Sequence, residues 1–338
     1  MTYFSTNTGF DATTLDFNLP LTGNAALIGS DTALPVDFIL RPHLVATGPL
    51  TQQISGAHDS YPSRFQIASD VGQGHSAYGN GFTFDPSGMI SGGTVQSLSV
   101  TNWAFSTYWQ ASGILLNATD YAAALASADR TDDQALVAGL MTGQDYVRLS
   151  HGDDTFDAGI GRDLILGFAG LDRLFGGHGN DLINGGISRD RMEGGLGADL
   201  IFGGQGEDHL YGGQGRDTLA GGTGFDTMTG GGGEDCFLFI AAGPNEIATI
   251  TDFQQGRDQI WINAAVFNGE LGFGSLNIAN VQGGTSIVFG DPARGNVQSI
   301  YLSGVTAANL SAADFNFSPE TELTASGQAF YHHWTFVG

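Results

Sequence analysis

One large apolar side chain recurs at every ninth position between residues 149 and 238. A nine-residue unit with a single apolar side chain cannot bury it alone, but two successive units can form a coil whose two short strands point both side chains inward. Coils stacked at about 4.8 Å let each strand hydrogen-bond to the strand two units later. We therefore predict two interior rows: Phe156, Leu174, Met192, Leu210 and Met228 in one, and Ile165, Ile183, Ile201, Leu219 and Phe237 in the other.

The segments on either side of these units alternate in the manner of β-strands. In residues 1–116, short runs such as Leu15–Leu19 and Ser97–Thr101 are separated by glycine and proline, which predicts an N-terminal antiparallel β domain. Residues 239–317 are predicted to form a second β domain that caps the open end of the stacked coils. Its three expected strands are Leu276–Val281, Thr285–Phe289 and Val297–Leu302, and a tail of residues 318–338 follows.

Residues 117–148 have a helical pattern instead. Asn117 or Thr119 can cap an alanine-rich turn, and Thr131–Gln134 has the form of a capping box for a second helix that stops at Gly143. The fold expected for the whole chain is all-β. It consists of a right-handed parallel β-roll of about five coils at residues 149–238, flanked by the two β domains and preceded by two short helices.

The turns between the predicted strands carry an aspartate at every ninth position. A glycine precedes each aspartate by two places, except at Ser188, because a reversal within one sheet spacing needs positive φ angles that glycine adopts easily. Stacking brings aspartates of alternate units together, and two charges about 5 Å apart repel by several kcal/mol at an effective dielectric constant near 20. A cation between them relieves this repulsion. Carboxylate and carbonyl oxygens, without imidazole or thiolate, favour Ca²⁺.

Pairing each unit with the one two places later gives at most about eight calcium sites. We expect about six strong ones, because Leu149-Ser150, Ala158-Gly159 and Gly167-Phe168 stand where the early units should have Gly-Gly. Asp252 and Asp258, after the last unit, fit either one further site or an ordinary surface turn. The predicted metal-site residues are Asp154, Asp163, Asp172, Asp181, Asp190, Asp199, Asp208, Asp217, Asp226 and Asp235, with Gly176, Gly179, Gly185, Gly194, Gly197, Gly203, Gly206, Gly212, Gly215, Gly221, Gly224, Gly230 and Gly233.

The composition supports a cation as the partner. The chain carries 35 acidic against 11 basic residues, a formal net charge of −24, and contains no lysine. Such a chain repels nucleic acid and anionic lipid. Cys236 is the only cysteine, so no disulfide can form within the chain. The sequence has neither an N-terminal secretory signal nor an uncharged apolar run long enough for a transmembrane segment.

Two units, Gly176–Asn184 (GGHGNDLIN) and Gly203–Tyr211 (GGQGEDHLY), are clean copies of the phrase GGxGxDxUx. This phrase resembles the calcium-binding nonapeptide repeat of RTX proteins. The segment from Asp252 to Asp258 is similar to the one that closes the roll in that family, and Tyr301–Val305 with Leu310–Phe317 resembles the C-terminal part of type I secretion substrates. The resemblance implies an uncleaved C-terminal signal, export by the type I secretion machinery of a Gram-negative cell, an extracellular or cell-surface location, and folding on calcium binding outside the cell.

RTX repeats occur in proteases, lipases, epimerases, pore-forming toxins, adhesins and surface-layer proteins, so they do not define an activity. The chain has no HExxH protease motif, no GxSxG nucleophile elbow and no lysine for the acylation of a pore-former. We therefore predict a non-catalytic surface-layer, filament or adhesin subunit that binds itself or a cell-surface polysaccharide. The alternative is an enzyme or carbohydrate-binding accessory protein whose site lies in residues 1–116. The best constellation for such a site is Arg41, His43, His58, Asp59, Arg64, Asp70 and His75.

Overall fold

The structure is a computed structural model that divides into two compact units, Met1–Gly167 and Phe168–Gly338. No helix in the part of the chain that it describes is long and apolar enough to cross a membrane. It describes residues 2–6, 25–30, 63–69, 73–84, 90–102, 107–117, 119–120, 141–149, 151–239, 246–263, 271–291 and 296–317.

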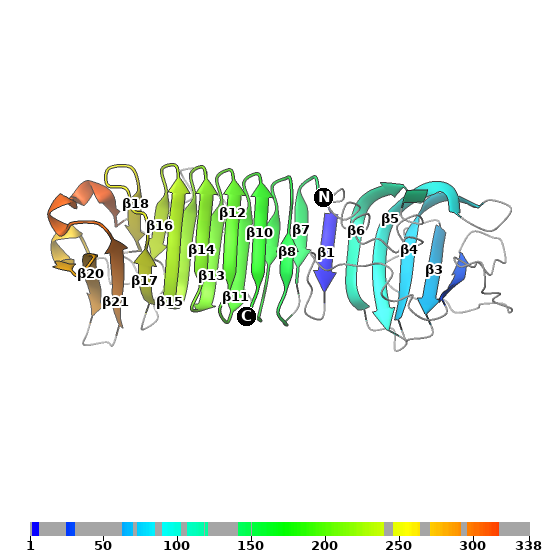
Figure 1. Ribbon diagram of the computed structural model, residues 1–338, viewed down its shortest axis with the longest axis horizontal. Coiled ribbons are helices and arrows are strands. Elements are labelled where there is room, and N and C mark those ends of the chain that lie inside the picture. Colours follow the sequence, from blue (N-terminus) through cyan, green and yellow to red (C-terminus); the bar gives the residue numbers. More distant parts are fainter. Residues whose placement is uncertain are drawn as a thin grey trace. The chain divides into compact units, whose positions relative to one another are not determined.

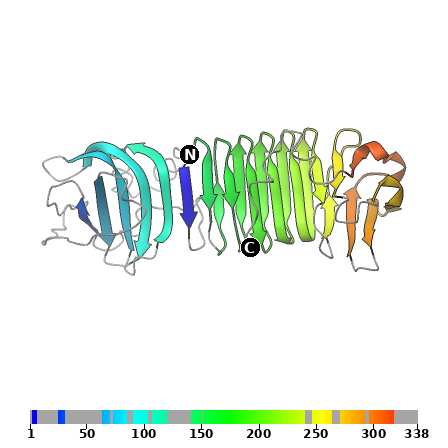
Figure 2. The same ribbon diagram turned by 180° about the vertical axis from the view of Figure 1, so that it is seen from behind.

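The second unit is built on two columns of parallel strands, which Figure 1 shows from the front and Figure 2 from behind. Each strand pairs with the strand two repeats later, and Leu174 lies opposite Met192 as Ile183 lies opposite Ile201. The predicted pairing of alternate repeats is thus confirmed, and the repeats form a parallel β-solenoid of about five turns. Column one contains β10 (Arg173–His178), β12 (Arg191–Leu196) and β14 (His209–Gln214); column two contains β11 (Leu182–Ile187) and β13 (Leu200–Gly206); the long β15 (Thr218–Gly232) pairs with both β13 and β14.

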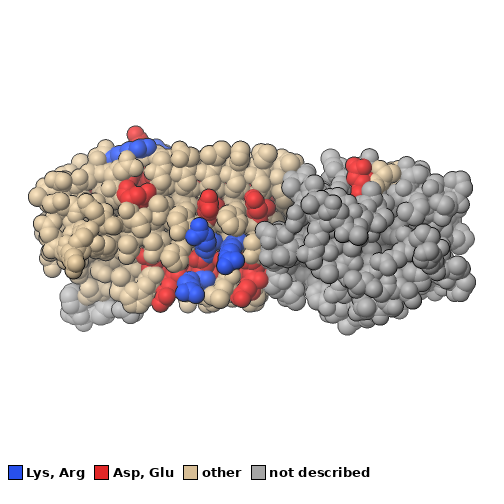
Figure 3. Space-filling model, in the orientation of Figure 1, with Lys and Arg blue, Asp and Glu red and all other residues tan. Residues whose placement is uncertain are grey.

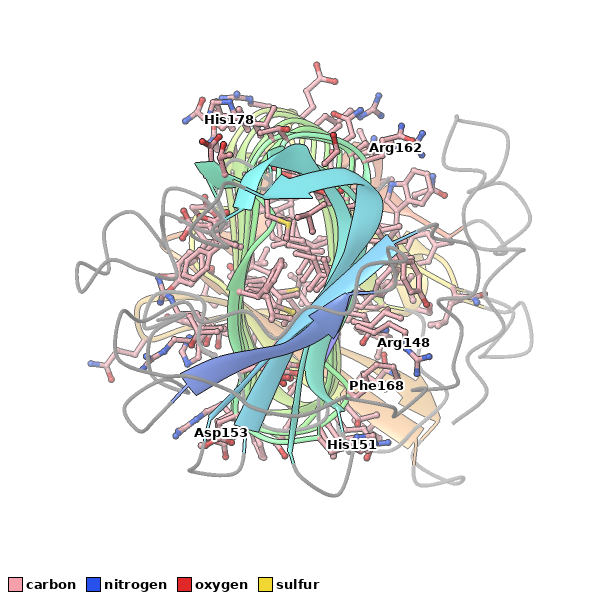
Figure 4. The ribbon with its side chains drawn as sticks, turned by 90° about the vertical axis from the view of Figure 1, so that its right-hand side faces the viewer. Arg148, His151, Asp153, Arg162, Phe168 and His178 are labelled. Carbon is pink, nitrogen blue, oxygen red and sulfur yellow. The ribbon has the colours of Figure 1, made fainter. Side chains whose placement is uncertain are left out.

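The interior of the solenoid holds the predicted apolar rows. Phe156 is 1% exposed, and the other nine predicted side chains are 0% exposed. Figure 4 looks along the solenoid and shows side chains filling the coil, while the labelled His178 lies on its outside. Burial of one such side chain is worth about 1.5–3 kcal/mol, so the repeats stabilise one another only when stacked.

Both columns continue beyond the last repeat. In column one, β15 pairs in parallel with β17 (Glu246–Ile250), which pairs with β21 (Asn296–Ser303). In column two, β16 (Cys236–Phe239) pairs with β18 (Gln259–Ile262), which pairs with β22 (Phe315–Asn316). The strands β19 (Asn277–Val281) and β20 (Gly284–Asp291) then run antiparallel next to β21. In the described part of this segment, 3-10 turns lie at Phe273–Ser275, Ala307–Asn309 and Ala312–Asp314.

In the first unit, the strands described within residues 1–117 pair antiparallel in the order β2, β3, β4, β5, β6, β1. The strand β1 also pairs in parallel with β7, which pairs in parallel with β9. The bounds are β1 Thr2–Thr6, β2 Ala25–Ser30, β3 Ser63–Ser69, β4 Gln73–Phe84, β5 Ile90–Asn102, β6 Thr107–Asn117, β7 Asp145–Arg148, β8 Thr155–Asp157 and β9 Leu164–Leu166.

Residues 117–148 were predicted to form a helical connector, but the end of this segment is a β-strand. Residues 145–148 form the strand β7, so parallel strands begin before residue 149. Thr119 and Asp120 are helical, whereas residues 121–140, which carry most of the two predicted helices, lie outside the described residues.

The turns use the positive φ angles that the glycine pattern predicts. Gly195 and Gly197, in one representative turn, have φ of 110° and 139°. Two non-glycine residues at glycine positions follow the same path, Phe168 with φ of 74° and Ser188 with φ of 94°. Such a conformation costs on the order of 1–3 kcal/mol for a residue with a side chain. The turn geometry therefore persists where the repeat is degenerate, but at a lower stability.

Candidate metal centre

The predicted aspartates form two buried rows, one running along each column of strands. Each lies two residues before an interior side chain, at the end of the turn, and none is more than 2% exposed. Within the second unit, aspartates separated by 18 residues stand on neighbouring strands, as the stacking prediction requires. The acidic side chains visible on the roll in Figure 3, interspersed with arginines, are thus largely other residues.

One carboxylate oxygen is used to align the coils at Asp190, Asp199, Asp208, Asp217, Asp226 and Asp235. The backbone N–H of Asp190 donates to Asp208 Oδ1 at 2.8 Å, and the N–H of Asp208 donates to Asp226 Oδ1 at 3.0 Å. The other row repeats this bond, for example from Asp199 to Asp217 at 2.9 Å. Each carboxylate is held at a fixed angle between two coils, with its second oxygen directed elsewhere.

The second oxygen, Oδ2, is buried and lacks a hydrogen-bond partner within the described residues at Asp190, Asp199, Asp208, Asp217, Asp226 and Asp235. A buried, unsatisfied carboxylate oxygen is strongly unfavourable. Six such oxygens in the same position of successive turns indicate a ligand that accepts their lone pairs. A hard cation is the group that fits.

Glycine keeps the space beside each Oδ2 open. A Cβ atom placed on Gly212 would lie 2.6 Å from Asp217 Oδ2 and 2.6 Å from the carbonyl oxygen of Gly230 in the next coil. A Cβ on Gly176 would likewise lie 2.6 Å from Asp181 Oδ2 and 2.7 Å from the Gly194 carbonyl oxygen. A carboxylate oxygen and a carbonyl oxygen therefore border the same small space. This donor set suits Ca²⁺.

The predicted glycines thus divide into two groups. Gly176, Gly185, Gly194, Gly203, Gly212, Gly221 and Gly230 border the aspartate Oδ2 atoms. Gly197, Gly206, Gly215, Gly224 and Gly233 instead pack against a carbonyl group one coil earlier, where no Cβ fits. Gly179 has the positive φ of this second group, 140°. Only the first group lies where a cation ligand is needed.

Burial shifts the acidity of these carboxyls. It raises the pKa of Asp190, Asp199 and Asp217 from 3.8 to about 7, and that of Asp208 to about 8, because desolvation outweighs the stabilising backbone hydrogen bond. The pKa of Asp226 rises to about 6 for the same reason. Neighbouring aspartates of the same row add to the effect at Asp199 and Asp208. A proton or a cation is therefore needed to hold these rows together.

The aspartate rows contain two members that the sequence prediction missed or left open. Asp145 is 3% exposed, and its N–H donates to Asp163 Oδ1 at 2.7 Å. Asp258 is 2% exposed; its Oδ1 accepts from Asp235 N–H at 3.2 Å and its Oδ2 from Gln254 N–H at 2.8 Å. Both have a glycine two places before and an apolar residue two places after, Val147 and Ile260. This spacing of glycine, aspartate and apolar residue could have identified both aspartates in the sequence.

Asp252 and Asp258, which fit either one further calcium site or a surface turn in the sequence, both accept hydrogen bonds from backbone N–H groups. Asp252 accepts hydrogen bonds from the N–H groups of Gly230 and Gly231 at 2.9 and 2.8 Å. Both oxygens of Asp258 are likewise occupied by backbone N–H groups. Backbone donors satisfy these two carboxylates, which therefore fasten the closing segment to the last repeats.

Other polar residues of the repeats lie away from the rows. His151, His178 and His209 are exposed, as predicted, and so is Glu207. Asn180 accepts a hydrogen bond from Ala198 N–H at 2.9 Å and acts as a turn residue. No group of three or more His, Cys, Asp or Glu side chains is placed to hold one metal ion among the described residues. A cation here would need backbone carbonyl ligands.

The alternative constellation in the N-terminal segment receives no side-chain description. Arg41, His43, His58, Asp59 and Asp70 lie outside the described residues. Arg64 stands on β3 opposite Tyr78, and His75 stands on β4 opposite Ile67. The backbone alone does not bring the two into one site.

The raised pKa values predict that acid can replace the cation. In chelator, the folded roll binds more protons than the unfolded chain at any pH between about 4 and 8, since the folded pKa values of about 6–8 exceed 3.8. Its stability therefore rises as pH falls through that window. Far-ultraviolet circular dichroism in chelator should show little β signal at pH 8 and more at pH 5.5, with light scattering to exclude aggregation. A β signal that is strongest at pH 8 and weakens on acidification would contradict the assignment.

Comparison with known proteins agrees with this geometry. Residues 141–238 match the family model described as RTX calcium-binding nonapeptide repeat (4 copies), in overlapping segments at 141–165, 151–183, 160–192, 184–219 and 211–238. No curated protein matches the chain.

Among solved structures, the chain is similar to the AlgE6R3 and AlgE6R2 subunits of the mannuronan C5-epimerase from Azotobacter vinelandii. Identities are 27% and 29%, TM-scores 0.25 and 0.26, and the alignments cover 41% and 42% of this chain and 79% and 90% of those chains. It is also similar to the extracellular lipase LipA from Serratia marcescens, at 15% identity and a TM-score of 0.25, over 52% of this chain and 40% of that chain. The family match covers the segment that holds the aspartate rows: residues 141–238 of this chain are RTX calcium-binding nonapeptide repeats.

Proposed function

We propose that this protein is secreted, folds when its repeats bind calcium outside the cell, and then has a non-catalytic structural or interaction role at the cell surface or in the extracellular matrix. The observation that supports the proposal most strongly is the two rows of buried Oδ2 atoms, in which those of Asp190, Asp199, Asp208 and Asp217 border the same space as a glycine carbonyl oxygen. A surface-layer, filament or adhesin subunit needs such a rigid scaffold.

We assign the calcium ligands to the aspartate Oδ2 atoms and the carbonyl oxygens of the glycine-rich turns. Among the described residues, Oδ2 is buried and without a hydrogen-bond partner at Asp190, Asp199, Asp208, Asp217, Asp226 and Asp235. We propose about six strong calcium sites and at most about eight in total, from the pairing of alternate repeats. When bound, calcium supplies positive charge to carboxylates that are otherwise buried and mutually repulsive.

The same arrangement makes folding conditional on the compartment. At strand spacing, two ionised carboxylates about 5 Å apart repel by roughly 3 kcal/mol at an effective dielectric constant near 20. In a cytosol poor in free calcium this repulsion keeps the coils apart, which suits passage through a type I secretion channel. Sites with dissociation constants of about 10⁻⁴ to 10⁻³ M, as in extracellular modules, then fill outside the cell. The RTX-like segments at Tyr301–Val305 and Leu310–Phe317 support this route.

A non-catalytic role is favoured over an enzyme by the motifs in the sequence. The aspartate rows are buried, which suits a structural role. The known protease and lipase motifs are missing from the sequence. The alternative is an enzyme or carbohydrate-binding accessory protein whose site lies in residues 1–116, and it predicts a calcium-loaded monomer rather than an assembly.

The ligand assignment can be tested by removing one charge from a row. Asp208→Asn keeps the Oδ1 acceptor for Asp190 N–H but replaces the proposed calcium ligand Oδ2 by an amide NH₂ group. The calcium concentration at the folding midpoint should rise by about tenfold, the effect of losing about 1.4 kcal/mol of binding. The control is Glu207→Gln, which removes the same charge one residue away from an exposed side chain. Equal midpoints for the two variants would refute the assignment.

The structural role can be tested by electron microscopy of the full chain with and without calcium. We expect ordered sheets or filaments when calcium is present and none in chelator. The chain would have to be assigned to the alternative if it stayed a calcium-loaded monomer at high concentration, as measured by sedimentation in parallel.

A further inference from the structure

The two columns of the roll present outward faces of different character. On each strand, the residues next to the interior side chain point outward. In column one these include Arg173, Arg191 and His209, all exposed, and Arg191 stacks over the ring of Tyr211 at 4.5 Å. Column two instead presents mostly apolar residues, together with Asn184, Thr218 and Gln259. Its outward residues from β11 to β18 include Leu182, Leu200, Phe202, Thr218, Ala220, Cys236, Leu238 and Trp261.

Part of this column-two face is buried although it points away from the interior. Phe202 is 8% exposed, Ala220 is 3% exposed and Leu238 is 2% exposed. The equivalent outward position of column one carries Tyr211, which stays partly exposed. Strand stacking is the same in both columns, so stacking alone does not account for the difference. Some segment covers the column-two face.

Among the described residues, the partly buried hydrophobic side chains packed against the cluster of Phe202, Ala220 and Leu238 are Leu200, Cys236 and Trp261. All three belong to the same face of the same column. The covering segment must therefore be sought among residues outside the described ranges.

We propose that the C-terminal segment, residues 318–338, docks on the outward face of column two. The last described strand, β22, pairs with β18 in this column, with Asn316 opposite Trp261, so the segment departs from an edge of the face. About twenty extended residues reach roughly 65 Å, whereas four coil spacings require only about 20 Å. The other segments of the second unit outside the described ranges, residues 240–245, 264–270 and 292–295, are short.

The chemistry of the segment suits the face. From Leu323 to Gly338 it contains no Asp, Glu, Lys or Arg, in a chain whose net charge is −24. Phe330, Trp334 and Phe336 occupy positions of one parity, so an extended chain places all three on the same side. An apolar edge of this kind would bury the leucines and Phe202 without introducing unpaired charges.

The only cysteine of the chain provides a reporter on this face. Cys236 points outward between Thr218 and Gln259 in the strand register. The test measures the rate at which a maleimide labels Cys236 in the calcium-loaded full chain. The combined substitution Trp334→Ser and Phe336→Ser should raise this rate by about tenfold or more, as expected for a loss of about 1.4 kcal/mol of docking energy. The control His333→Ser with Thr335→Ser alters the opposite side of the segment and should leave the rate unchanged.

A substitution on the other partner completes the test. Leu200→Ser, on the outward face, should also accelerate labelling, and combining it with the segment substitutions should add little, because both remove the same contact. Circular dichroism with calcium verifies that each variant keeps the roll; the segment variant alone decides the outcome if Leu200→Ser does not. Unchanged labelling in the segment variant would overturn the proposal. Protection that appears only at concentrations where the chain dimerises would also overturn it, in favour of a second copy as the cover.

Discussion

The repulsion between buried carboxylates in two rows is the constraint on which the rest of this structure depends. Strand pairing sets the spacing of the coils at about 4.8 Å, and the aspartates cannot move farther apart without breaking the β ladder. Burial raises the pKa of Asp208 to about 8, because desolvation opposes its charge. The hydrophobic rows therefore cannot close at neutral pH unless positive charge enters the turns. The interior and the turns form a single cooperative system.

The two oxygens of each carboxylate have different roles. Oδ1 accepts a backbone N–H from the preceding coil, which fixes the side chain, as between Asp208 and Asp190 at 2.8 Å. Oδ2 then faces a space bordered by a glycine carbonyl oxygen, and glycine is required there because a Cβ would fill the space. Each repeat thus provides the ligand oxygen and also the open space beside it. One aspartate and a few glycines in nine residues are therefore sufficient to form a cation site between coils.

Much of this could be predicted from the sequence, because the period of nine residues determines both rows and both interior columns. Asp145 was missed because Gly143 served equally well as a helix stop and as the first glycine of another unit. The division between Oδ1 and Oδ2 was not predictable, since it depends on the orientation of a side chain between two coils. The apolar outward face also escaped prediction. Phe202, Ala220 and Leu238 occupy variable positions within their units and align only after stacking every 18 residues.

We propose that calcium links the coils and restricts folding to a compartment where calcium is abundant, and that other parts of the chain contact partners. The most direct test is an anomalous-scattering map of crystals grown with calcium. The proposed ligand set predicts peaks within calcium-ligand distance, about 2.3–2.6 Å, of Oδ2 in Asp190, Asp199, Asp208, Asp217, Asp226 and Asp235. An intact roll without peaks at these oxygens, with Oδ2 bound to water instead, would contradict it.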